Sequence, residues 1–87
     1  MIWNRMTEFT PIGLVFSDRR PSRVIRTLGD AAAALLRDWP SDHGEEYKSA
    51  VKACVGAISG EIELAEFRKR LIRAAGEAGI TAFSIVH

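Results

Sequence analysis

The stretch from Phe9 to Phe16 constrains the fold most, because it is apolar on both sides of an extended chain. Successive side chains of a strand point to opposite faces of a sheet. Ile12 and Leu14 therefore share one face with Phe16, while Pro11 and Val15 share the other with Phe9. A strand covered on one side only alternates apolar with polar residues. This strand is expected to be central in a sheet or covered on both sides.

The other segments are separated by proline and glycine and carry either helix or strand periodicity. Their order is ββαααβ, which predicts one α+β domain over residues 1–87. We expect a small, mainly antiparallel three-stranded sheet packed on three helices. The segments are an N-terminal stretch (1–8), a β-hairpin (9–28), three helices (28–39, 42–59 and 61–78) and a closing strand (80–86).

Caps and apolar stripes define the three predicted helices. Thr27, followed by Asp30, resembles a capping box at the start of the first helix. Gly60 and Gly79 are expected to end the second and third helices in the left-handed conformation. Spacings of three and four residues place further apolar side chains on the buried stripes, among them Leu36, Val55 and Ile58.

Two blocks of residues resemble the signature of a known family. The first, from Trp39-Pro40 through Gly44 and Tyr47 to Cys54, reads W-P-x-x-x-G-x-x-Y-x-x-A-x-x-x-C. The second, from Arg68 to Ile80, is similar to A-R-x-x-F-[IL]-x-A-A-x-E-A-G-I. Together they resemble the bacterial family known as domain of unknown function 982. The resemblance implies a short single-domain fold, with these residues as its structural signature, and no established activity.

No catalytic or metal-binding constellation is expected. Cys54 and His43 could form a nucleophile and base, but on one helix they would lie about 16 Å apart. Cys54 is instead expected to be a small core residue. Asp42, His43 and the neighbouring Glu45 and Glu46 match no metal-ligand spacing, and carboxylates favour a helix N-terminus. We therefore expect no cofactor, and no enzyme activity.

Trp39 and Tyr47 bracket the turn between the first two predicted helices. They could stack on a base or ligand ring, but the favoured interpretation is a plug in the seam between helices, with polar atoms at the surface. Gly44 beside them is expected to permit close helix approach or an unusual backbone angle.

With a formal net charge of only +1, the chain as a whole is not expected to attract nucleic acid strongly. Arg19, Arg20 and Arg23 gather at the predicted hairpin tip and are candidate phosphate contacts. Because charges on edge strands also block unwanted pairing, binding of nucleic acid or another anion is the alternative function rather than the leading one.

A cytoplasmic location is expected. A lone cysteine cannot form an internal disulfide, no apolar run approaches the ~20 residues that cross a bilayer, and no cleavage site follows the apolar stretch. A membrane partner is therefore not expected.

Self-association is the leading functional hypothesis. Phe9, Pro11 and Val15, together with Trp3 upstream, give the chain more apolar surface than one covered sheet face can bury. Contiguous exposed apolar area marks an interface, so we expect a non-catalytic interaction module that forms a homodimer or binds another protein. The alternative is that the N-terminal segment folds across that face within one chain.

Overall fold

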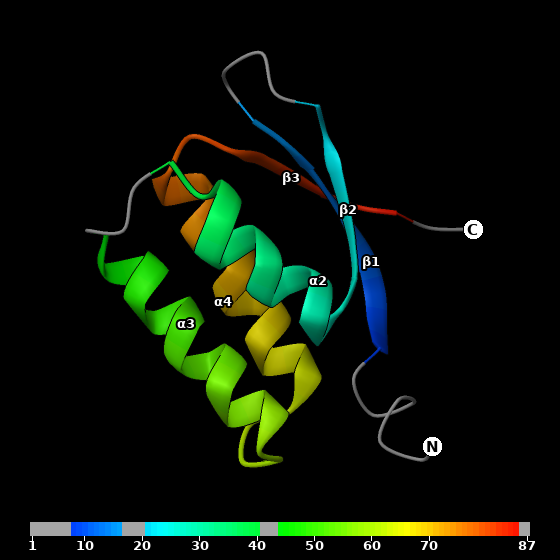
Figure 1. Ribbon diagram of the computed structural model, residues 1–87, viewed down its shortest axis with the longest axis vertical. Coiled ribbons are helices and arrows are strands. Elements are labelled where there is room, and N and C mark those ends of the chain that lie inside the picture. Colours follow the sequence, from blue (N-terminus) through cyan, green and yellow to red (C-terminus); the bar gives the residue numbers. More distant parts are fainter. Residues whose placement is uncertain (1–7, 17–20, 41–43, 86–87) are drawn as a thin grey trace.

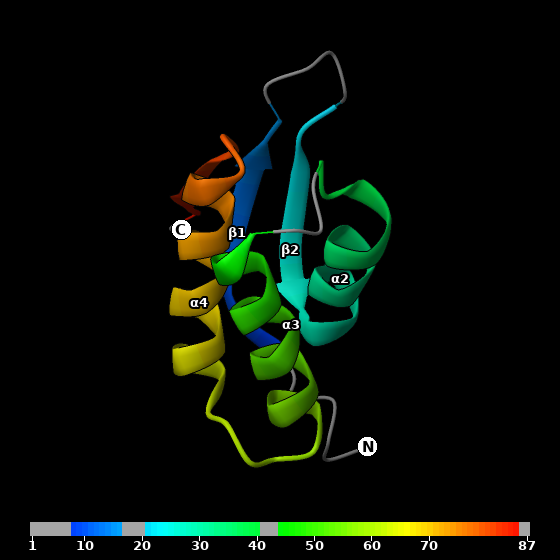
Figure 2. The ribbon, with the colours of Figure 1, turned by 90° about the vertical axis from the view of Figure 1, so that its left-hand side faces the viewer.

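The computed structural model describes residues 8–16, 21–40 and 44–85, with Glu8 and Phe9 described by their backbone only. Three antiparallel strands form one sheet in the order β2-β1-β3, and the helices all lie on one side of it (Figures 1 and 2). The α+β class and the antiparallel three-stranded sheet are confirmed.

The sheet is built around β1 (Glu8–Val15), which pairs with β2 (Arg23–Thr27) on one side and with β3 (Thr81–Ser84) on the other. The apolar strand is therefore central, as its sequence predicts. Ile12 and Leu14 point into the core and are fully buried.

The register of β1 against β2 shifts between Glu8 and Ile12, and Pro11 lies inside this irregular stretch. Proline has no N–H, and because the backbone of Pro11 faces β3, that N–H is missing only at the end of the β1–β3 ladder, where proline is tolerated. Ile85 donates its N–H to the carbonyl of Pro11 at 2.9 Å, so pairing with the C-terminal segment continues past this residue.

The first helix consists of α2 (Leu28–Ala33) and a π-helical turn, η1 (Ala34–Asp38). Asp30 donates its N–H to Thr27 Oγ1 at 3.1 Å, so the expected cap is present. Ala34 and Leu35 follow Ala31 at the regular spacing of three and four residues and are buried. Leu36, on the far edge of the expected stripe, is 74% exposed, so the expectation that it is buried is wrong.

The second helix, α3 (Glu45–Ile58), buries three small residues, Ala50, Ala53 and Cys54. Gly56 faces Ile62 so closely that a Cβ on Gly56 would lie 2.6 Å from Ile62 Cδ1. Because the chain packs against the small-residue side of α3, Val55 and Ile58 remain 63% exposed. Their predicted place on the buried stripe is wrong.

The third helix, α4 (Leu64–Glu77), begins three residues later than expected. Glu63 is its N-cap, with extended backbone angles, and the N–H groups of Glu61 and Ile62 bond the carbonyl of Gly56. Gly60 and Gly79 have φ of +85° and +76°, the left-handed conformation expected at both positions.

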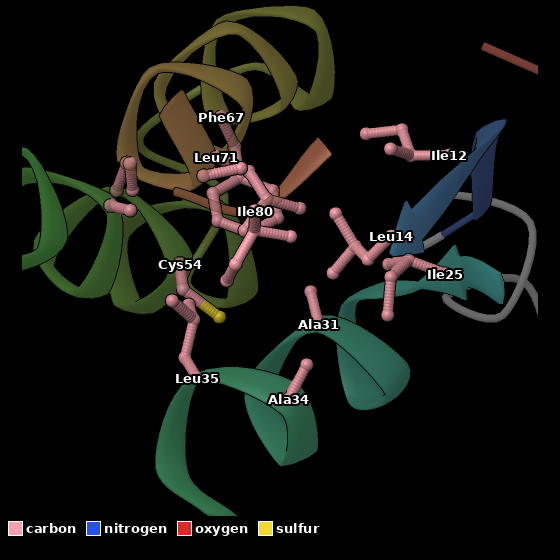
Figure 3. Close-up of a cluster of buried hydrophobic side chains, with 14 of the residues drawn as sticks. Ile12, Leu14, Ile25, Ala31, Ala34, Leu35, Cys54, Phe67, Leu71 and Ile80 are labelled. Carbon is pink, nitrogen blue, oxygen red and sulfur yellow. The ribbon is translucent and has the colours of Figure 1, made fainter. Parts of the chain in front are cut away.

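The core lies between the helices and the inner face of the sheet (Figure 3). Strand residues point toward aromatic and aliphatic side chains of α4, and the alanines of α2 and α3 bring the backbones close. The largest fully buried side chains are Phe67, Ile12, Leu14, Ile25, Leu28 and Leu71.

Candidate functional site

The outer face of the sheet carries no helix among the described residues. Val15 and Val24 are each 42% exposed on it, and Phe83 is 47% exposed. Val24, Gly13 and Phe83 are consecutive partners across β2, β1 and β3, so they form one row. Half-buried Pro11 and Ile85 lie on the same side. We call Pro11, Val15, Val24, Phe83 and Ile85 the outer apolar face.

Gly13 shapes the middle of this face. A Cβ built on Gly13 would lie 2.3 Å from Cζ of Phe83, so the aromatic ring occupies the space above the glycine. An aromatic side chain across a strand from glycine fills the gap that the missing side chain leaves. The centre of the sheet is therefore level and apolar.

Only two of the four residues that the sequence suggested for self-association have side chains among the described residues. The structure puts Pro11 and Val15 on the outer apolar face, whereas Trp3 and the side chain of Phe9 lie outside the described residues. Val24 and Phe83 were not among these candidates. Strand alternation could have identified them. It places Val24 on the other face of the sheet from Ile25, and Phe83 on the other face from Ala82.

The basic hairpin tip contributes one described residue. Arg23 Nε lies 2.8 Å from Asp38 Oδ2, so this guanidinium joins β2 to the end of η1. Its charge is already paired within the chain. Arg19 and Arg20 lie outside the described residues, and phosphate binding at the tip stays a prediction.

The aromatic pair of the family signature lies between helices. The rings of Trp39 and Tyr47 have centroids 6.3 Å apart and are tilted by 39°. The Tyr47 hydroxyl donates to the carbonyl of Leu35 at 3.0 Å. Trp39 Nε1 is buried and has no hydrogen-bond partner among the described residues. Their contacts are those of the seam plug, although the polar atoms turn inward instead of toward solvent. Pro40 follows Trp39 and is exposed.

Gly44 has a role different from the two that its position in the turn suggests. Its backbone angles are ordinary (φ −69°, ψ 144°), so no unusual conformation requires glycine. A Cβ there would collide with the carboxylate of Glu77, which accepts the N–H groups of Glu46 and Tyr47 at 3.2 Å each. Glu77, the last residue of α4, thus caps the start of α3.

Cys54 is buried among core side chains, and burial raises the pKa of its thiol above the ordinary value. A cysteine nucleophile needs the opposite shift, so this position favours a packing role. His43 lies outside the described residues. Within the described part of the chain, no group of three or more His, Cys, Asp or Glu residues could hold a metal ion.

Arg68 ties the third helix to the sheet. Its Nε donates to the carbonyl of Thr10 at 3.2 Å, and Nη2 donates to Ser84 Oγ. Thr10 lies in the irregular part of β1, where the register against β2 shifts. The arginine therefore satisfies strand backbone that the ladder leaves out, and it is a structural residue.

A depression of ≈ 570 Å³ runs along α3 beside Lys48 and Lys52, and it is open to solvent. Arg70 on its rim is held by Glu66 Oε2 at 3.0 Å and Ser49 Oγ at 2.7 Å. No enclosed, chemically equipped cleft is formed there. No helix of the described residues is long and apolar enough to span a membrane.

Comparison with known proteins gives one match. The model of a family described as "Protein of unknown function (DUF982)" matches residues 10–82. No curated protein matches the chain, and no solved structure does.

Proposed function

The chain belongs to the DUF982 family of proteins of unknown function, and we propose that it is a non-catalytic interaction module that pairs with a second copy through the outer apolar face. The observation that carries this proposal is the exposure of Val15, Val24 and Phe83 on a sheet side that no described helix covers.

A second copy is a suitable occupant for three reasons. The face is level at its centre, because Phe83 covers Gly13, and two such faces can stack as in a β-sandwich. A two-fold axis brings the same patch of each copy together, so the patch need only fit itself. The net charge of +1 per chain gives little repulsion between copies.

The test is sedimentation velocity over a concentration series with the Val24→Glu variant. Val24 is exposed in one chain, so glutamate is tolerated by the fold, but a dimer would take its carboxylate out of water. We expect the wild type to form dimers and Val24→Glu to weaken them at least about tenfold. Circular dichroism checks that the variant is folded.

Val55→Glu is the matched control, because Val55 is also an exposed valine but lies on α3, away from the sheet. It should leave the dimer intact. A wild type that stays monomeric at high micromolar concentration would contradict the proposal. So would dimers that Val55→Glu disrupts and Val24→Glu does not.

A further inference from the structure

The free edge of β3 presents unpaired backbone groups. Ile85 N–H bonds the carbonyl of Pro11, and hydrogen-bonded pairs recur at every second residue of an antiparallel ladder. Phe83 and Thr81, which pair with Gly13 and Val15, therefore direct their backbone groups toward β1. The N–H and C=O groups of Ala82 and Ser84 point to the opposite side, where the described residues form no further strand.

The free edge of β2 differs. Ile12 and Leu14 of β1 face Ile25 and Arg23, so the same alternation turns the Arg26 N–H away from β1. Asp30 Oδ2, just inside α2, accepts that N–H at 3.1 Å. Arginine side chains and an internal acceptor are devices that keep an edge strand from pairing.

The residues of β3 carry no such protection. The strand reads Thr81-Ala82-Phe83-Ser84, with no charge and no proline. Arg68 reaches Ser84 Oγ from α4, on the helix side of the sheet. Its guanidinium is held there by the Thr10 carbonyl as well, so it does not stand in line with the strand edge.

We propose that β3 is a second self-association site, where it pairs antiparallel with β3 of another copy about a two-fold axis through Phe83. Ala82 of each copy then faces Ser84 of its partner, and the pair exchanges four backbone hydrogen bonds. The two Phe83 residues face each other, and two three-stranded sheets become one of six strands. This pairing does not depend on the face-to-face contact, and the two together would give a dimer of dimers.

The experiment is disulfide trapping of Phe83→Cys in the Val24→Glu background, which weakens the proposed face-to-face contact. The Cα atoms of a facing, non-hydrogen-bonded pair lie about 4.5 Å apart, within the span of a disulfide. Thr81→Cys is the matched control. Thr81 would face Ile85 of the partner, leaving the two Thr81 Cα atoms at least about 13 Å apart. Cys54 stays in place because it is buried.

We expect the Phe83→Cys protein to form covalent dimers at least tenfold faster than the Thr81→Cys protein. Adding Ala82→Pro removes an N–H from the free edge and none from the ladder with β1, so it should slow the Phe83→Cys reaction to the control rate. If this variant does not fold, Thr81→Lys, which adds a charge beside the edge, replaces it.

Equal rates at positions 83 and 81, or trapping unaffected by a folded edge variant, would overturn the proposal. Neither result bears on dimers measured without the Val24→Glu change.

Discussion

The effect of Gly44→Ala on the unfolding free energy is expected to depend on Glu77, because the two residues are in contact. The Glu77 carboxylate accepts two of the N–H groups that the start of α3 leaves without helical partners. Removing such a cap costs about 0.5–2 kcal/mol, and loss of the negative charge from the helix start adds to this. Glu77→Ala should therefore lower the unfolding free energy by about 1–2 kcal/mol.

Gly44→Ala should have a similar effect in the wild type for a steric reason. The built Cβ lies 1.8 Å from Glu77 Oε1, so the carboxylate must leave its position and the cap is lost. The backbone angles at Gly44 suit alanine. In the Glu77→Ala background the same change should therefore shift the unfolding free energy by less than about 0.5 kcal/mol, since reduced unfolded-state freedom and poorer N-capping oppose each other.

The assay is urea denaturation of the four proteins in a double-mutant cycle. The expected coupling energy between positions 44 and 77 is about 1–2 kcal/mol, and for a chain of this size each kcal/mol shifts Tm by roughly 4–8 °C. Glu61→Ala, on an exposed residue outside the helices, is the control and should be neutral. Equal effects of Gly44→Ala in both backgrounds would refute the reasoning.

Four further outcomes are expected from the burial and contacts of individual residues. Cys54 should react with iodoacetamide far more slowly in the native state than in urea, since its pKa is raised by burial. Because the folded state holds the thiol proton more tightly, the unfolding free energy should fall as pH rises above 9.0, and less so in Cys54→Ala, as denaturation at pH 8 and 10 would show. Arg68→Ala should speed amide exchange in β3 more than Arg73→Ala, an exposed arginine on the same helix. Phe67→Ala should lower the unfolding free energy by about 3–5 kcal/mol in urea titrations.

The order and type of the elements could be predicted from local pattern, because apolar periodicity and caps are properties of neighbouring residues. Thr27 and Asp30 define a helix start wherever they occur together, and Gly60 and Gly79 mark helix ends. The centrality of β1 followed from its two apolar faces. Predicting these features requires no information about contacts between segments.

The buried faces of the helices could not be predicted from periodicity alone. Val55 and Ile58 fit a helical stripe as well as Ala53 does, but the structure buries Ala50, Ala53 and Cys54 and leaves Val55 and Ile58 exposed. Leu36 is exposed because the buried side of the first helix is centred on Ala31, Ala34 and Leu35, and Leu36 lies away from it. Which side of a helix is buried depends on its contacts with other segments, and the periodicity of the helix does not contain that information.

Only part of the candidate site could be predicted, because some of its residues come together only in the folded sheet. Apolar residues in excess of one core predicted an interface, and two of the residues named for it, Pro11 and Val15, lie on the outer apolar face. Val24 and Phe83 join them only through the strand register, which places both opposite Gly13. The partnership of Gly44 with Glu77 spans more than thirty residues, and no local spacing indicates it.

The central claim is that two copies meet through the outer apolar face, and isotope-filtered NMR tests it most directly. A mixture of labelled and unlabelled protein reports only contacts between copies. Intermolecular NOEs should appear at the methyl groups of Val15 and Val24, and none at those of Leu36, Val55 or Ile58. Intermolecular NOEs confined to the helix methyls, or none at all at millimolar concentration, would contradict the account.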